Sequence, residues 1–282
     1  MIQLQNSLAE CYFPSGNEDD ALLGKTTHLG IGAHQDDLEM LAIHGILAGL
    51  EHEDQSFTGV TVTDGRGAPR TGEFADYSDD DMWQVRCKEQ RQAADIGRYN
   101  AQFQLNYASA QVKSSKRNNV ISDLMTIIQT CQPRIIYTHN LADKHDTHVA
   151  VALSVIEALR RLGQEAQGIT VYGSEIWRGL DWLADELKVA LDVSGHPELQ
   201  VELLLAFHSQ IEGGKRYDLA TMGRRRANAT YYQSHHTDHA ELLTYAMDLT
   251  PLIKNPQLSV GEYVDDIIQN LAKDVQERLG RL

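Results

Sequence analysis

The chain has little cysteine and no long apolar segment. Its three cysteines, Cys11, Cys87 and Cys131, lie far apart among 282 residues and form no CxxC pair. Such a sparse and odd-numbered set argues against a disulfide framework and favours free thiols in a reducing compartment. No apolar run is long enough to span a bilayer, and the first residues lack the basic and apolar regions of a signal peptide. We therefore expect a cytoplasmic protein without a membrane span.

Basic residues are also scarce. Lysine and arginine together number 25 against 40 aspartates and glutamates, which gives a formal net charge of -15. A surface that binds nucleic acid normally needs a basic face, so this charge balance argues against a nucleic-acid partner. It leaves room for a small anionic ligand held by a few local arginines. The hydrophobic content of 42% is enough to build a globular core.

Short apolar runs alternate with helical patterns four times over the first 165 residues. The runs predict buried strands at 26–33, 57–63, 103–107 and 134–138. The intervening patterns predict helices at 37–50, 79–98, 116–130 and 149–162. This alternation is typical of a parallel sheet with helices on both faces, joined by right-handed crossovers.

The later part of the chain is less regular. It predicts strands at 169–172 and 189–193 and helices at 198–209 and 260–279. No linker rich in proline, glycine or serine interrupts the chain. We therefore expect a single domain over 1–282, with a core at about 26–211 and a C-terminal elaboration at about 212–282.

A histidine followed by two acids stands where the first predicted strand gives way to a helix. The segment reads Ala33-His-Gln-Asp-Asp-Leu-Glu39. Ligands of open parallel sheets sit beyond the carboxyl ends of the strands, and buried carboxylates are costly unless they are paired or bind metal. His34 and Asp37 can converge on one ion from such a turn. A helix N-cap followed by first-turn acids would explain the segment equally well on its own.

A second polar segment follows the fourth predicted strand and opens a helix. It contains His145 and His148, whose i, i+3 spacing places both on one side of a helix. A lone HxxH would be weak evidence, but here it is paired with HxDD at another strand end of the same sheet. Two histidine nitrogens and one carboxylate with an open position form a catalytic zinc set. The two segments together therefore predict one metal site.

These motifs resemble those of the PIG-L superfamily of N-deacetylases. The family shares an AHPDD(x)E motif and a later HPDH motif, which correspond to AHQDDLE and HDTH in this sequence. The segments 86–97 and 206–210 also resemble the family, the second of them its HxSQ segment. The resemblance runs in the right order over about residues 27–211. It implies a Rossmann-like three-layer α/β/α fold with a mostly parallel sheet and an elaborated C-terminal part.

The resemblance also implies an activity and assigns roles to residues. It implies a metal, usually Zn²⁺ with another first-row divalent ion as the alternative, and hydrolysis of the acetamide of an N-acetylglucosamine-type substrate. The family's metal ligands correspond to His34, Asp37 and His148. Its general base corresponds to Asp36, and its histidine that stabilises the tetrahedral intermediate corresponds to His145. Members of the superfamily often form closed oligomers, so a homo-oligomer is a further expectation.

Two departures from the family motifs concern the site. Gln35 replaces a proline, which loosens the turn and removes no ligand. The change from HPDH to HDTH places Thr147 where the family has an acid that supports the neighbouring histidine. Asp143 or Asp146 is the candidate substitute. We expect His145 to be protonated and to meet the oxyanion, a contribution of about 3–4 kcal/mol for one good donor.

Three further residues are candidates for substrate binding. Arg66 and Arg70 lie in a glycine-rich turn after the second predicted strand, where they can rim the site or remain solvated. His208 can line the pocket, contact a neighbouring subunit or cap a helix end. The basic runs at 213–216 and 223–226 can bind an anion, although solvated or subunit-contacting loops explain them better. The histidine-rich segment 235–239 resembles a metal site but has no second ligand segment.

Two other functions fit part of the sequence. His34, Asp36 and His148 also spell the HxD…H facial triad of non-haem iron oxygenases, but those sites usually occur in all-β barrels. A catalytically altered metal- and sugar-binding protein is compatible with the HDTH departure. Asp36, which catalysis needs and metal binding does not, argues against that interpretation.

Overall fold

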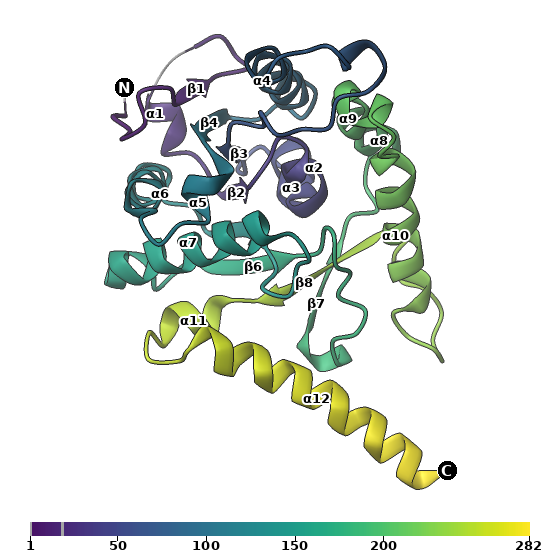
Figure 1. The fold of residues 1–282 in the computed structure, drawn as a ribbon. Helices are drawn as coiled ribbons and strands as arrows, with labels where there is room; N and C mark the ends of the chain where they lie inside the picture. The colour runs from purple at the N-terminus through teal and green to yellow at the C-terminus, as the bar shows by residue number, and fades with distance from the viewer. Residues whose placement is uncertain (1, 18–19) are drawn as a thin grey trace.

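A single mixed sheet forms the centre of the molecule (Figure 1). The computed structural model describes residues 2–17 and 20–282, and its strands are β1 (Glu10–Tyr12), β2 (His28–Gly32), β3 (Phe57–Thr63), β4 (Ala101–Tyr107), β5 (Ile135–His139), β6 (Thr170–Ser174), β7 (Lys188–Asp192) and β8 (Leu243–Asp248). The sheet has the order β1-β4-β3-β2-β5-β6-β8-β7. Neighbouring strands from β4 to β6 are parallel, whereas β1, β8 and β7 pair antiparallel.

Helices cover both faces of this sheet. They are α1 (Asp20–Leu23), α2 (Asp37–Leu41), α3 (Ile43–Glu51), α4 (Asp79–Ile96), α5 (Ser109–Val112), α6 (Asn118–Cys131), α7 (Asp146–Leu162), α8 (Pro197–Leu205), α9 (His208–Glu212), α10 (Tyr217–Tyr231), α11 (Thr250–Lys254) and α12 (Val260–Arg281). Short 3-10 turns occupy Gly72–Phe74, Gly163–Ala166 and Asp185–Leu187. One core joins the sheet to α6 and α7, and a second joins it to α2, α3, α4 and α8. The predicted three-layer α/β/α fold with a mostly parallel sheet is confirmed.

The strand order places a crevice between β2 and β5. The order in which the chain adds strands to the sheet reverses at this point. β3 and β4 lie on one side of β2, whereas β5 and β6 lie on the other. The loops that follow β2 and β5 therefore diverge onto opposite faces, which is the place where open α/β sheets bind ligands. Both predicted polar segments follow these two strands.

Glycines on two strands, Gly30 of β2 and Gly59 of β3, allow α2 to lie close to the sheet. A Cβ atom added at Gly30 would come within 3.0 Å of Leu38 Cδ2 on α2 and 2.7 Å of Phe57 Cζ. One added at Gly59 would come within 2.8 Å of the Leu38 side chain. The close approach holds α2 against the sheet, next to the histidine and the acids that precede and open this helix.

The structure differs from the sequence expectation in several helices and in one strand. The helix predicted at 37–50 is two helices separated by Ala42, and the helix predicted at 198–209 is interrupted between α8 and α9. The basic run at 223–226 lies within α10, so the prediction of a loop there is wrong. β8 was not predicted, and it inserts between β6 and β7 of the same sheet. None of the helices in the described residues is both long and apolar enough to cross a membrane.

Candidate metal centre and active site

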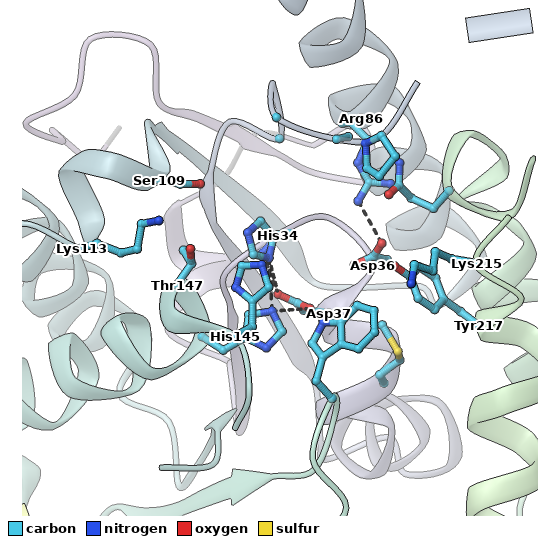
Figure 2. A pocket seen from close by; sticks show the side chains of 18 residues that line it. His34, Asp36, Asp37, Arg86, Ser109, Lys113, His145, Thr147, Lys215 and Tyr217 are labelled. Carbon is cyan, nitrogen blue, oxygen red and sulfur yellow. Dashed lines mark hydrogen bonds and ion pairs between the residues drawn. The ribbon is translucent and has the colours of Figure 1, made fainter. Parts of the chain in front are cut away.

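The turn between β2 and α2 has a conformation that few residue types adopt easily. Asp36 has φ 91° in the left-handed region, where Asp and Asn are the commonest residues after glycine. The backbone N–H of His34 donates to Asp37 Oδ2 at 2.6 Å, which closes the turn. As a result His34 and Asp37 face one way, while the Asp36 side chain lies on another side of the turn, beside Arg86 (Figure 2).

The segment from the end of β5 to the first turn of α7 supplies three histidines to the same crevice. His139 ends β5, His145 precedes α7 and His148 lies in its first turn. His139 Nε2 accepts a hydrogen bond from the Ala33 backbone N–H at 2.8 Å and so links the ends of β5 and β2. Its ring stacks on that of His148 with the centroids 3.9 Å apart. His139 is fully buried, and it therefore packs beneath the site as a support for His148.

His34, Asp37 and His148 converge on one point. His34 Nδ1 lies 3.2 Å from His148 Nε2 and 3.4 Å from Asp37 Oδ2. His148 Nε2 lies 3.4 Å from Asp37 Oδ1. One ligand atom from each of the three residues lies within 4.8 Å of the other two. The donor set and its spacing fit a divalent ion with an open position toward the cavity.

The electrostatics of Asp37 also suit a metal ligand. Burial raises the pKa of this carboxyl, but the neighbouring His148 and His139 together with hydrogen bonds to its oxygens hold the pKa well below its usual range. Asp37 is therefore ionised at neutral pH although it is almost completely buried. An anionic oxygen among histidine nitrogens is the environment that a cation requires.

Asp143 supports His148 from behind. Its Oδ1 lies 3.4 Å from His148 Nδ1, and the same oxygen accepts the backbone N–H of His145 at 3.0 Å. Asp143 Oδ2 accepts the backbone N–H of Trp177 at 3.1 Å. This carboxylate is the partner that metal-binding histidines commonly have. It takes the place of the acid missing from HDTH, but it contacts the ring of His148 rather than that of His145.

We predict that Asp143→Asn lowers metal affinity about 10–100-fold, the usual effect of removing such a supporting carboxylate. Competition with a chromophoric chelator would measure the affinity. Asp146→Asn is the matched control, because Asp146 is an exposed residue at the start of α7, three positions after Asp143. Equal affinity in the Asp143 variant and in the wild-type protein would remove Asp143 from this role.

Asp36 lies beside the histidine cluster in a buried ion pair. Its Oδ2 is 3.0 Å from an Arg86 nitrogen, and Arg86 also lies 3.2 Å from Glu89 Oε2. Burial raises the pKa of Asp36 to about 6, against the opposing effect of Arg86. Glu89 in turn accepts the backbone N–H and the hydroxyl of Ser209 at 2.6 and 2.8 Å. The HxSQ-like segment is thereby tied, through Glu89 and Arg86, to the carboxylate of Asp36.

His145 lies at the mouth of the cluster. Its ring centroid is 4.9 Å from that of His34 and 4.7 Å from that of His148. Burial and the adjacent His34 lower its pKa from 6.5 against the opposing effects of Asp37 and Asp143. The structure therefore favours a neutral imidazole at neutral pH, which differs from the protonated side chain expected from the sequence. A neutral ring still has one N–H to donate.

These side chains line a cavity of about 410 Å³ at the carboxyl ends of β2 and β5. Its lining comprises His34, Asp36, Asp37, Met40, Gly65, Gly67, Ala68, Pro69, Arg86, Ser109, Lys113, His145, Thr147, His148, Trp177, Gln210, Lys215 and Tyr217. Figure 2 shows the histidine cluster between Lys113 and Ser109 on one side and Lys215 and Tyr217 on the other. The volume is that of a pocket for a small molecule.

Three residues proposed for substrate binding lie outside this lining. Arg66 pairs with Asp64 at 3.2 Å and with Asp80, and its guanidinium lies 4.5 Å from the Trp83 ring centroid. Arg70 pairs with Asp79. Both arginines thus point toward the acidic start of α4, and only small residues of their loop reach the cavity.

His208 is also directed away from the cavity. Its Nε2 lies 2.8 Å from Glu73 Oε1, and more than half of its side chain is exposed. Its neighbour Gln210 lines the cavity instead. The histidine-rich segment 235–239 contributes no metal cluster, since within residues 2–17 and 20–282 only His34, Asp37 and His148 converge as one.

Sequence reasoning missed Lys113 and assigned no site role to His139. His139 stands at the carboxyl end of a predicted strand, the same signal that identified His34. Lys215 belongs to the basic run at 213–216, for which a solvated or subunit-contacting loop was the favoured interpretation. No motif surrounds Lys113 in the sequence. It lines the cavity only because of the path that the chain takes after β4, and this path could not be predicted from the sequence.

The fold and the site together define a three-layer α/β/α protein with a His-Asp-His cluster at the crevice of a parallel sheet. Residues 29–159 match the family model PIG-L, described as GlcNAc-PI de-N-acetylase. The resemblance to this family that the two motifs predicted is thus confirmed over residues 29–159. No curated protein matches the sequence.

Several solved structures share the fold. A conserved protein from Thermus thermophilus is 17% identical, with a TM-score of 0.60 over 83% of this chain and 100% of its own. The 4-carboxy-2-hydroxymuconate hydratase GalB from Pseudomonas putida is 17% identical, with a TM-score of 0.61 over 79% and 95% of the two chains. The N,N'-diacetylchitobiose deacetylase from Pyrococcus horikoshii is 17% identical, with a TM-score of 0.59 over 82% and 88%. At such identities the likeness is one of fold.

Proposed function

We propose that this protein is a metal-dependent N-deacetylase that hydrolyses the acetamide of an N-acetylated amino sugar. The observation that carries the proposal is the convergence of His34, Asp37 and His148 beside the buried carboxylate of Asp36, at the floor of one cavity. The PIG-L match over residues 29–159 and the fold of a chitobiose deacetylase support it. Because a hydratase has the same fold, the reaction has to be established by an activity assay.

The metal is held in this proposal by His34 Nδ1, an Asp37 carboxylate oxygen and His148 Nε2. Two nitrogens and one oxygen suit Zn²⁺ and also other first-row divalent ions. When bound, such an ion supplies a Lewis acid that activates water and polarises an amide carbonyl. Asp143 fixes the His148 ring through Nδ1, and His139 supports it by stacking.

Asp36 is the proton carrier in this mechanism. Water adds to the acetamide carbonyl carbon while a carboxylate oxygen of Asp36 takes its proton, and the same proton then passes to the amine nitrogen as the C–N bond breaks. The products are acetate and the free amino sugar. A pKa near 6 leaves Asp36 mostly ionised at neutral pH and still able to release a proton to an amine. Arg86 fixes the orientation of the carboxylate.

His145 and the aromatic wall have supporting roles. In this mechanism the His145 N–H donates a hydrogen bond to the oxyanion that forms on the acetamide, whether or not the ring is protonated. Trp177 and Tyr217 pack edge to face, 6.1 Å between centroids, and form the wall on which a sugar ring can lie.

Acetate release from a panel of N-acetylated hexosamines, measured together with metal content, tests the function. We expect acetate to be released in the presence of a divalent ion and release to stop after chelation. Metal binding without acetate release from any member would contradict the deacetylase and leave a metal- and sugar-binding protein or a hydratase. Addition of water to a 2-hydroxymuconate-type substrate, followed as the loss of that substrate's ultraviolet absorbance, would then identify the hydratase.

The iron oxygenase hypothesis has no support in the geometry. Asp37, not Asp36, is the carboxylate grouped with the two histidines, and Asp36 is paired with Arg86 instead. The sheet is mostly parallel and covered by helices, unlike the barrels of those enzymes. Substrate-dependent oxygen consumption by the iron-loaded protein would support the oxygenase hypothesis.

A further inference from the structure

Two lysines face the cavity from its opposite walls. Lys113 follows the short helix α5, and Lys215 lies in the loop before α10. Figure 2 shows them on either side of the histidine cluster, and both line the cavity. Neither forms an ion pair with any residue in the described part of the chain. In a chain with a formal net charge of -15, two unpaired cations at one cavity are a marked local exception.

The acidic groups of the cavity do not neutralise these lysines. Asp36 and Asp37 are the acidic side chains of the described lining. Asp36 is paired with Arg86 at 3.0 Å, and Asp37 is surrounded by histidine nitrogens within 3.4 Å. A bound divalent ion would add positive charge. With such an ion bound, the two lysines would leave the cavity with an excess of positive charge, and its walls would concentrate that field on whatever enters.

The surroundings of each lysine keep its charge available at the cavity. Lys215 Nζ lies 5.1 Å from the centroid of the Trp177 ring, a cation–π contact that holds the ammonium group near the cavity wall. On the other side, Thr147 lines the cavity with a neutral hydroxyl where the HPDH motif has an acid. No carboxylate from that position competes for Lys113.

We propose that the substrate carries an anionic substituent, a phosphate or a carboxylate, and that Lys113 and Lys215 determine this specificity. The inference rests on the proposed deacetylase and names the class of its substrate, an acidic N-acetylated amino sugar. The aromatic wall and the histidine cluster take the sugar and its acetamide, and the lysines take the charge that the sugar bears. Phosphate and carboxylate share the chemistry that an ammonium group recognises.

The test compares matched sugars on the metal-loaded protein. N-acetylglucosamine is the neutral probe, N-acetylglucosamine 6-phosphate and 1-phosphate are the phosphate probes, and N-acetylmuramic acid is the carboxylate probe. We expect at least one acidic probe to exceed the neutral sugar roughly 10-fold in kcat/KM, the effect of one partly exposed charge-assisted hydrogen bond. The advantage should shrink with ionic strength, because salt screens the attraction. The probe that gains most distinguishes phosphate from carboxylate.

Lysine variants show whether these residues cause the preference. Lys113→Gln and Lys215→Gln should each lower kcat/KM for the preferred acidic probe several-fold more than they lower kcat/KM for N-acetylglucosamine, chiefly by raising KM for the acidic probe. Lys116→Gln is the matched control, because Lys116 is an exposed lysine three residues after Lys113 and outside the cavity lining. Circular dichroism would verify that all three variants fold.

The outcomes separate this inference from the proposed function. Equal rates on neutral and acidic sugars, or equal losses on both in the lysine variants, would overturn the inference while acetate release sustains the deacetylase. If no sugar releases acetate, calorimetric titration with the same four probes decides the matter. Binding of acidic probes that both lysine variants weaken would sustain the anionic specificity and reject the deacetylase, whereas no such binding would reject both.

Discussion

Asp36→Asn should lower kcat roughly 10²–10⁴-fold, the usual effect of losing a general base. The substitution keeps the shape of the side chain and one oxygen for Arg86, but it removes the group that accepts the proton of water. Because Asp36 lies outside the convergent set of ligand atoms, metal content should remain near that of the wild-type protein. Rate measurements on metal-loaded protein, with metal determined by plasma emission, give both results on one sample.

Asp265→Asn is a matched control for this substitution. Asp265 is exposed on α12, so its amide should change neither rate nor metal content. Retention of full activity by Asp36→Asn would show that another group moves the proton. Loss of metal together with activity would make Asp36 a ligand and would favour the HxD…H arrangement of an iron site.

Asp37→Ala should abolish most metal binding and reduce activity at least as far as Asp36→Asn does. Asp37 supplies the carboxylate of the convergent set, and its oxygens lie 3.4 Å from both His34 Nδ1 and His148 Nε2. Removal of a carboxylate ligand takes away both a donor atom and the negative charge that offsets the cation. Equilibrium dialysis followed by metal analysis would measure the loss.

The comparison of Asp36 with Asp37 makes this second prediction specific. These two adjacent aspartates have identical side chains, and their proposed roles differ because their carboxylates point in different directions. If Asp37→Ala bound metal as tightly as Asp36→Asn does, the assignment of ligands would fail. Thermal unfolding of the metal-free variants would separate a local loss of ligands from a general loss of structure, because Asp37 also closes the turn through the His34 backbone N–H.

Much of the fold could be predicted because its signals are local. The strand at 57–63 and the start of the helix at 79 follow from an apolar run, a turn and a cluster of acidic residues that short stretches of sequence contain. β8 escaped prediction because its place between β6 and β7 depends on pairing with strands distant in the chain. α10 escaped because arginines obscure its pattern, although Arg225 is buried and donates to the carbonyl of Glu39 at 2.8 Å.

The site divides in the same way. His34, Asp37 and His148 could be grouped from the sequence because the carboxyl ends of parallel strands meet at one edge of a sheet. The directions of long side chains could not be predicted. Arg66 and Arg70 lie on a loop that borders the cavity but turn toward acids of α4. Asp143 could be named as a substitute for the missing acid, yet only the fold decides which histidine it supports.

The left-handed backbone of Asp36 has a consequence for how this site can lose its activity. With φ at 91°, the position accepts glycine, asparagine and aspartate far more readily than other residues. Among these three, only aspartate has a titratable side chain. The backbone conformation restricts the position to these three residues, and proton transfer requires a titratable side chain. Aspartate is the residue that meets both requirements. A homologue that kept the turn but lost hydrolytic activity would most readily have asparagine or glycine at this position. It would then retain the three metal ligands and lack the general base.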